Sequence, residues 1–490
     1  MSDLPIPIIG LAVAVFVLIL LVLRTKVHPL IAIITAACVA GITGGLSVNE
    51  TLDAITKGFG ATLGTIGIVI GLGVMMGRIL EVSGAAEQIA YSFIKWLGHR
   101  REEWALALTG YLVSIPIFVD SAFVILYPIA KALAQKGNRS LLTLGVALAG
   151  GLIVTHTMVP PTPGPLGVAG LFGVDIGSMM LLGIVLALPC TLAIVWYAQW
   201  LGRTYPDFVG TVVQEDLKAV HADYLKEKES KPLPSLTKSL LPILVPIGLI
   251  FLKAVTNLFP SLEATDGTTL SWVLQVVAFA GSPVIALCIS TLIAVYTLVP
   301  HLNRHETSER LEEGLKSAGI ILMVTGAGGA LGFVVRESGS GAQLAALMAN
   351  LPFSPIMIPF FVATIVRLIQ GSGTVAMITA ASITAPILVN LPDVNMLFAA
   401  QAAVLGSLFF SYFNDSFFWV VNRMMGIADV KLQLMTWSVP TTIAWAIGGV
   451  LIALVNLVFG TNGSLLDPLI PLAGLGVMLV VIRRKGDFKQ

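Results

Sequence analysis

The stretch Trp104-Ala-Leu-Ala-Leu-Thr-Gly-Tyr-Leu-Val-Ser-Ile-Pro-Ile-Phe-Val-Asp-Ser-Ala-Phe-Val-Ile-Leu-Tyr-Pro-Ile-Ala130 decides the fold of this chain. Basic loops, Lys95–Arg101 and Lys131–Arg139, flank this apolar segment on both sides. Because basic loops mark the cytoplasmic side of a membrane, the segment must enter and leave on that side. It is too short for two spans of about 20 residues each. We therefore predict a re-entrant hairpin, which survives only where it is buried in protein or lines a wet cavity.

The composition places the whole chain in a membrane. Its 490 residues are 56% hydrophobic and only 11% charged, with a mean hydropathy of +0.92, whereas soluble domains carry about 25% charged residues. Runs such as Leu4–Leu23 and Ile176–Leu201 are long enough to cross a bilayer. The balance of 28 Lys and Arg against 27 Asp and Glu argues against a nucleic-acid partner. The three cysteines form no CxxC pair, which excludes a disulfide or zinc scaffold, and we expect no cofactor.

The chain contains two similar halves. Residues of the first half recur in the second at a constant offset of 255, and the pairs are Gly71/Gly326, Gly73/Gly328, Gly77/Gly332, Ser83/Ser338, Gly84/Gly339, Gln88/Gln343 and Ala90/Ala345. The basic loops change sides between the halves, since 301–316 and 421–431 carry Arg and Lys whereas 261–270, 337–353 and 389–396 carry none. We therefore predict two inverted-topology repeats in an all-α polytopic membrane protein, with the N-terminus outside and the C-terminus cytoplasmic.

The predicted domains follow from this repeat. They are a first repeat at 1–201, a cytoplasmic linker at 202–238, a second repeat at 239–459, and an extra C-terminal helix with a basic tail at 460–490. Each repeat holds a re-entrant hairpin (104–130 and 354–388) and a helix broken by Pro, Gly and polar residues (139–172 and 397–425). Paired interruptions of this kind point to the midplane binding site of a transporter. Bared N–H groups at the half-helix starts would cradle an anion.

The interruptions hold the candidate site residues. We expect substrate contacts from Ser114, Ser121, Thr155, Thr157, Arg367, Gln370, Gly371, Ser372, Gly373, Thr374 and Asn414. Proton coupling is assigned to Asp120, Asp415 and His156, because ionisable groups at membrane depth are usually functional. Alternatives stay open: both aspartates could cap half-helices, His156 could be an ordinary buried histidine, and Arg367 could pair with an aspartate instead of a substrate carboxylate.

Two other features are interpreted as structural. The glycines at 71–77 and 326–332 faintly resemble dinucleotide loops, but close helix packing through small residues explains them better. Arg78 and Glu81 are spaced (i, i+3), which favours an ion pair on one helix.

Four motifs resemble the signatures of the gluconate permease family. They are Ser114-Ile-Pro-Ile-Phe-Val-Asp-Ser121, Thr155-His-Thr-Met-Val-Pro-Pro-Thr-Pro-Gly-Pro165, Gln370-Gly-Ser-Gly-Thr-Val-Ala-Met-Ile-Thr379 and Asn414-Asp-Ser-Phe-Phe-Trp419. The resemblance covers almost the whole chain. It implies a bacterial inner-membrane symporter that takes up gluconate or a related sugar acid with protons, and the family includes a D-serine branch. The wider ion-transporter superfamily implies a homodimer in which a transport domain slides as an elevator.

We therefore expect a secondary active transporter for a small hydroxy-carboxylate, not an enzyme. Two departures from the family pattern fall in the expected pocket. Phe118-Val119-Asp120 stands where gluconate and D-serine members have Phe-Phe-Glu, and Tyr412-Phe413 stands where they tend to have His-Val. Alternative functions are symport of D-serine or another small organic acid, a cation-pumping subunit of a membrane decarboxylase complex, and a passive channel. No nucleophile or HExxH motif supports a membrane hydrolase.

Overall fold

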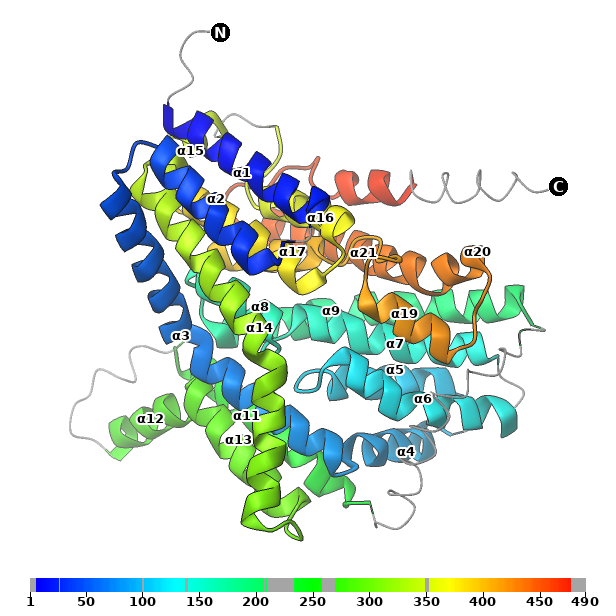
Figure 1. Ribbon diagram of the computed structural model, residues 1–490. Helices are drawn as coiled ribbons and strands as arrows, with labels where there is room; N and C mark the ends of the chain where they lie inside the picture. Colours follow the sequence, from blue (N-terminus) through cyan, green and yellow to red (C-terminus); the bar gives the residue numbers. More distant parts are fainter. Residues whose placement is uncertain are drawn as a thin grey trace, which may run out of the picture.

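A computed structural model describes the chain except residues 1–5, 26, 99–100, 137–139, 207, 209–232, 258–268, 349–351 and 477–490. The described residues form helices and no strand (Figure 1). Within these described ranges, six helices are long and apolar enough to cross a membrane, or seven if one bent pair is a single span. The predicted all-α polytopic membrane fold is therefore confirmed. Most of the 202–238 linker and the basic tail lie outside the described residues.

The first half of the chain contains the first hairpin and the first broken helix. Its helices are α1 (Ile6–Arg24), α2 (Pro29–Thr43), α3 (Val48–Val82), α4 (Ala85–Leu97), α5 (Glu102–Val113), α6 (Val119–Lys136), α7 (Leu141–Met158), α8 (Pro163–Phe172) and α9 (Ile176–Thr204). The α5–α6 pair is the hairpin, and α7 and α8 are the two parts of the broken helix.

The second half repeats this order. Its helices are α11 (Leu236–Asn257), α12 (Thr269–Ala280), α13 (Pro283–Leu298), α14 (Arg304–Glu337), α15 (Ser340–Met348), α16 (Met357–Gln370), α17 (Gly373–Leu388), α18 (Met396–Gly406), α19 (Ser416–Met424), α20 (Val430–Gln433) and α21 (Val439–Phe459). A π-helical turn, Leu434–Ser438, joins α20 to α21. The second hairpin is α16–α17, and α18 and α19 are the parts of the second broken helix.

The long helices α3 and α14 begin in the same way. In α3, Ser47 accepts a hydrogen bond from the Glu50 N–H, and the Glu50 carboxylate accepts one from the Ser47 N–H. Asn303 and Glu306 form the same reciprocal capping box at the start of α14. Such a box satisfies two backbone donors that a helix start otherwise leaves unpaired. Equivalent local sequences thus start equivalent helices in both halves.

The contacts between α3 and α14 support the predicted inverted repeat. A Cβ atom on Gly58 would lie 2.5 Å from the Gly329 carbonyl oxygen, and one on Gly314 would lie 2.8 Å from the Val74 carbonyl oxygen. The two helices therefore run antiparallel. Adding 255 to position 58 and subtracting it from position 329 gives positions 313 and 74, so these two contacts correspond within one residue. The small residues allow this close crossing, in agreement with their structural interpretation.

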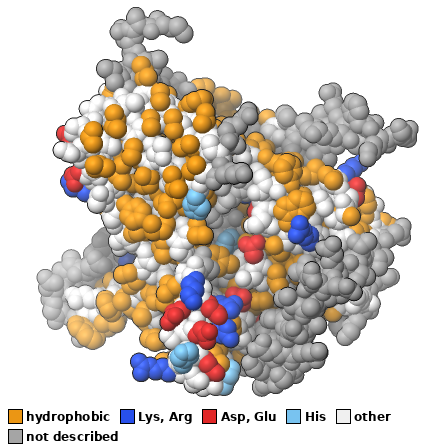
Figure 2. All heavy atoms as spheres, in the orientation of Figure 1, with side chains coloured by type: hydrophobic (Ala, Val, Ile, Leu, Met, Phe, Trp, Pro, Cys, Tyr) orange, Lys and Arg blue, Asp and Glu red, His pale blue; other side chains and the backbone are white. Residues whose placement is uncertain are grey.

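An ion-pair cluster fastens the same crossing. Arg78 donates from Nη1 to Glu81 at 2.7 Å, as its spacing predicted, and from Nη2 to Glu313 of α14 at 2.7 Å. Figure 1 shows α3 and α14 crossing beside the stacked helices α5, α6, α7 and α9. In Figure 2 hydrophobic side chains cover the upper part of this face, and charged side chains gather over the lower part of α14. That end of α14 therefore has the polarity of a solvated segment.

Several sequence expectations about helix limits are wrong. After residue 268 the chain does not form one straight span, because Gly281-Ser282-Pro283 interrupts the helix and α12 and α13 meet there at 71°. Region 301–316 was expected as a loop, yet most of it forms the first turns of α14, because the capping box at Asn303 starts the helix early. Short helices α4 and α15 also occupy parts of expected loops.

Candidate functional site

The tip of the first hairpin is held against α3. Helix α5 ends at Val113, and the Ser114 hydroxyl donates to the Ile117 carbonyl at 3.4 Å within the turn. A Cβ atom on Gly77 of α3 would lie only 2.1 Å from the Pro116 carbonyl oxygen. The tip therefore approaches α3 at a position where only glycine leaves room, which brings the start of α6 to the middle of the molecule.

The break between α7 and α8 is closed by one threonine. The Thr162 hydroxyl is bonded to two carbonyls at the end of α7, those of His156 at 2.7 Å and Val159 at 2.8 Å. Proline at 163, the first position of α8, has no N–H and a backbone torsion already suited to a helix start. One hydroxyl thus shares its proton between two carbonyls that the end of α7 leaves free.

The second hairpin tip and the second break are bonded to each other. The Leu368 carbonyl, near the end of α16, accepts hydrogen bonds from the Tyr412 hydroxyl at 2.6 Å and from Asn414 Nδ2 at 3.3 Å. Gly371 follows with φ at +92°, and a Cβ atom there would lie 2.2 Å from the Asn414 carbonyl oxygen. Glycine is required at this position by its conformation and by the close approach of Asn414.

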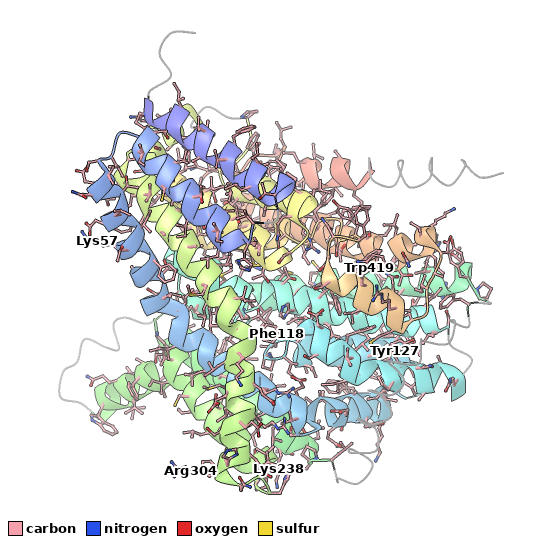
Figure 3. The ribbon with its side chains drawn as sticks, viewed as in Figure 1. Lys57, Phe118, Tyr127, Lys238, Arg304 and Trp419 are labelled. Atoms are coloured by element: carbon pink, nitrogen blue, oxygen red, sulfur yellow. The ribbon has the colours of Figure 1, made fainter. Side chains whose placement is uncertain are left out.

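Four helix starts converge on one cavity of about 510 Å³, namely those of α6, α8, α17 and α19. The residues that line it are Phe118, Val119, Asp120, Ile153, His156, Thr157, Gly164, Pro165, Ile320, Ile321, Val324, Arg367, Gln370, Ser372, Gly373, Thr374, Val375, Met377, Ile378, Ser407, Leu408, Asn414, Asp415, Ser416, Phe417 and Thr441. Figure 3 shows Phe118 at the centre of the molecule, beside the first hairpin tip. Each helix start directs the positive end of its dipole into this cavity.

The start of α17 keeps donors for an anion and has no acidic residue in its own first turn. The Ser372 N–H is bonded to Gln370 Oε1 at 3.0 Å and the Val375 N–H to Ser372 Oγ at 3.4 Å, but no hydrogen bond among the described residues uses the N–H of Gly373 or Thr374. By contrast, α8 starts with Pro163-Gly164-Pro165, and two of those residues have no N–H. Helices α6 and α19 carry an aspartate at their starts.

Arg367 supplies the positive charge beside this helix start. Its Nη2 donates to Asp415 Oδ2 at 2.8 Å, and the side chains are only 5% and 12% exposed. Nη1 lies 3.9 Å from the position that a Cβ atom on Gly373 would take. Nε is buried and has no hydrogen-bond partner among the described residues. The pairing with Asp415 that the sequence left open is therefore present, and the guanidinium retains further donor capacity toward the cavity.

The two aspartates of the cavity have different surroundings. Asp415 caps α19 by accepting from the Phe417 N–H at 3.2 Å, and it also accepts from Arg367 and the Ser411 hydroxyl. Asp120 is half-buried and has no ion-pair partner among the described residues. His156 packs its ring 5.9 Å from that of Phe118, and its Nδ1 is buried without a partner in the described part of the chain. The cavity is therefore lined by an acid without an ion pair and by an imidazole whose Nδ1 has no partner among the described residues.

Ten of the predicted site residues line the cavity: Asp120, His156, Thr157, Arg367, Gln370, Ser372, Gly373, Thr374, Asn414 and Asp415. Four do not. Ser114 is used inside the hairpin turn, Gly371 packs on Asn414, Ser121 follows Asp120 without reaching the lining, and Thr155 is fully buried in α7. Within the described residues no group of three or more His, Cys, Asp or Glu could hold a metal ion.

The wall that α14 contributes to the cavity was not predicted from the sequence. Ile320, Ile321 and Val324 line the cavity, but they are apolar residues inside an apolar helix and carry no signal in one sequence. Thr441 was also missed. Its signal was present, because Ser438-Val-Pro-Thr-Thr442 places three hydroxyls and a proline in an otherwise apolar span.

The fold and this cavity define a multi-pass membrane transporter for small molecules. The profile of the GntP family permease matches residues 6–458, and the chain belongs to that family. The chain is 64% identical to an uncharacterized permease of Haemophilus influenzae over 99% of both chains. It is 34% identical to the gluconate permease of Pseudomonas aeruginosa, over 91% of this chain and 96% of the relative. It is 33% identical to the Escherichia coli D-serine transporter DsdX, over 85% and 91%.

Solved structures with the same fold are more distant in sequence. The YdaH transporter of Alcanivorax borkumensis superimposes with a TM-score of 0.62 at 15% identity, over 93% of this chain and 99% of that one. MtrF of Neisseria gonorrhoeae gives 0.58 at 14% identity, over 91% and 96%. These two likenesses concern the fold alone.

Proposed function

We propose that this permease imports a small hydroxy-carboxylate, gluconate or a related sugar acid, together with protons. The observation that carries the proposal is the start of α17, where the free N–H groups of Gly373 and Thr374 lie beside Arg367. A carboxylate there would receive backbone hydrogen bonds, a helix dipole and a charge-assisted bond from the guanidinium. Gln370, Asn414 and Thr157 offer donors and acceptors for the hydroxyls of the same molecule.

The surroundings of the two acids divide their roles. Asp415 neutralises Arg367 and caps α19, so its charge is needed in place. Asp120 has no such partner, and we assign the transported proton to it. His156 faces the same cavity with Nδ1 unpartnered, which suits a second station on the proton path. Alternate hydration and desolvation of the cavity would make Asp120 bind and release a proton in each cycle.

The proposed movement is that of an elevator. Helices α5–α8 and α16–α19 carry both hairpins and both breaks, and they would slide as one transport unit against α1–α3 and α11–α14. A homodimer in the bacterial inner membrane, with the N-terminus outside, is part of the proposal. The positions of Lys238 and Arg304 at one end of the molecule in Figure 3 agree with a shared cytoplasmic side.

A second candidate substrate is a zwitterionic amino acid such as D-serine. The unpaired Asp120 carboxylate favours it, because an ammonium group could bind there while the carboxylate binds near Arg367. In that case Asp120 would be a substrate ligand instead of a proton carrier.

Uptake by the purified permease in proteoliposomes tests these assignments. A radiolabelled panel of D-gluconate, D-fructuronate, glycerate, D-serine and lactate is offered with an imposed pH gradient, with a sodium gradient, and with neither. We expect saturable accumulation of a sugar acid that depends on the pH gradient alone. Accumulation of D-serine alone would favour the zwitterionic substrate. Accumulation driven by the sodium gradient would exclude proton coupling, and flux that does not saturate would identify a channel. Failure of the purified chain to transport any of them would favour a subunit of a larger complex.

A further inference from the structure

The π-helical turn Leu434–Ser438 lies directly behind the second broken helix. Its Trp437 is only 1% exposed, and the indole Nε1–H donates to Ser411 Oγ at 2.8 Å. The Ser411 hydroxyl in turn donates to Asp415 Oδ2, which accepts from Arg367 Nη2 at 2.8 Å. A continuous chain of side-chain hydrogen bonds therefore runs from Trp437 through Ser411 and Asp415 to the guanidinium at the cavity.

The chemistry of the groups fixes the direction of this chain. An indole N–H can only donate, so the Ser411 oxygen must accept from Trp437. Ser411 then has its single hydroxyl proton left for Asp415, and the carboxylate accepts it. Asp415 Oδ1 is occupied by the Phe417 N–H at 3.2 Å. Each group in the chain has one arrangement that satisfies its neighbours, which restricts the orientation of the carboxylate that holds Arg367.

The backbone of Ser411 is restrained as well. Its N–H donates to Thr441 Oγ1 at 3.2 Å, and its carbonyl accepts from the Ser438 hydroxyl at 2.5 Å. Ser438 closes the π-helical turn, and Thr441 of α21 reaches the cavity. π-Helical turns are rare and occur mostly at functional sites. Here the turn supplies both the indole and the hydroxyl that hold Ser411 from behind.

We propose that Ser411 and Trp437 are positioning residues for substrate binding: through Asp415 they hold Arg367 in the orientation that receives the substrate carboxylate. This inference rests on the proposed function for its substrate, and on the hydrogen-bond chain for its residues. It predicts that loss of the chain weakens substrate binding more than it slows the transport cycle, because none of these bonds spans α3 or α14.

The first measurement is the KM and maximal rate of D-gluconate uptake in proteoliposomes. Trp437→Phe removes one N–H but keeps a ring against Phe417, whose centroid is 4.8 Å away. We expect a KM increase of about 3-fold for Trp437→Phe and about 10-fold for Ser411→Ala, with maximal rates within about 2-fold of wild type. The double variant should match Ser411→Ala alone, since the indole acts only through Ser411. Additive effects, or a fall in maximal rate with KM unchanged, would overturn the proposal.

Trp445→Phe is the matched control. Trp445 is also a buried tryptophan of the same region, and its Nε1 donates to the Thr364 hydroxyl at 2.9 Å, outside the chain and the cavity lining. Its KM should stay at the wild-type value. A KM increase in Trp445→Phe equal to that in Trp437→Phe would show a general packing effect and would contradict the positioning role of Trp437.

A second measurement needs no substrate. The rate at which phenylglyoxal modifies Arg367, followed by peptide mass spectrometry, reports how firmly Asp415 holds the guanidinium. We expect a rise of about 3-fold or more in Ser411→Ala and Trp437→Phe, and none in Trp445→Phe. If the wild type transports nothing in the panel but this rise appears, the proposed function fails and the positioning chain stands. Unchanged modification rates together with unchanged KM values would refute the proposal that this series of hydrogen bonds positions Arg367.

Discussion

Asp120 and Asp415 face the same cavity, but of these two only Asp415 accepts hydrogen bonds from neighbouring residues in the described part of the chain. We predict that Asp120→Asn abolishes accumulation of substrate driven by a pH gradient, because the amide cannot carry a proton. Exchange of labelled for unlabelled substrate at equal pH should persist, since binding at α17 and Arg367 is intact. Both are measured in the same proteoliposomes.

The control for this change is Asp53→Asn. Asp53 is 60% exposed and pairs with Lys57 on the outer part of α3, so its loss should leave accumulation unchanged. Full accumulation in Asp120→Asn would show that Asp120 does not carry the transported proton. If Asp120→Asn loses both exchange and accumulation, Asp120 is instead a substrate ligand, as the zwitterionic substrate requires.

At this scale the sequence identified the types of residue but not their pairing. Polar and ionisable groups inside apolar segments can be found because they are costly at membrane depth. Whether Arg367 contacts Asp415 depends on how segments 48 residues apart meet, and no local pattern encodes that meeting. The same limit applies to Trp437, which reads as an ordinary apolar residue until its N–H is seen on Ser411.

At the scale of elements, the second hairpin tip depends on the absence of a side chain at Gly371. We predict that Gly371→Ala separates the tip from the second break, because a methyl group would lie 2.2 Å from the Asn414 carbonyl oxygen. The left-handed φ costs about 1–2 kcal/mol, and the clash adds about 1–3 kcal/mol. Thermal unfolding should therefore occur at a lower temperature, and uptake should be lost.

Gly45→Ala separates these two costs. Gly45 has a similar φ of +98° but no atom within 4 Å of the added Cβ position. We expect a small fall in melting temperature from the backbone strain alone, and uptake close to wild type. Equal damage from both substitutions would mean that backbone conformation, and not the contact with Asn414, sets the requirement for glycine.

Elements were predictable where the sequence interrupts an apolar run. Proline, glycine and polar clusters indicated the breaks after Met158 and Gly406 and both hairpin tips. Gly281-Ser282-Pro283 carries the same kind of signal, and the helix breaks there between α12 and α13. The π-helical turn could not be predicted, since Leu434-Met-Thr-Trp-Ser438 has an ordinary composition and the extra residue is accommodated by its packing against Ser411 and Phe417.

At the scale of the whole molecule, an elevator requires that α8 move relative to α3. A Cβ atom on Gly170 of α8 would lie 3.9 Å from the Ile66 Cβ of α3, which is the Cβ separation of an ordinary disulfide, about 3.8 Å. With Cys38, Cys190 and Cys288 replaced by alanine, we predict that oxidation of a Gly170→Cys/Ile66→Cys pair abolishes uptake and that a reductant restores it.

The control cross-link lies within α1–α3, which belong to the part of the molecule that would stay fixed while the transport unit slides. A Cβ atom on Gly41 of α2 would lie 3.0 Å from the Thr51 Cβ of α3, so a Gly41→Cys/Thr51→Cys pair can also be cross-linked after a small shift. Because α2 and α3 stay together in an elevator, this cross-link should leave uptake unchanged. Normal uptake with the α8–α3 link fully oxidised would mean that the hairpins and breaks do not slide on α3. The cavity would then have to open by movement of the hairpin tips alone, which places the required flexibility at Gly371 and Pro116 instead of at the α3–α8 contact.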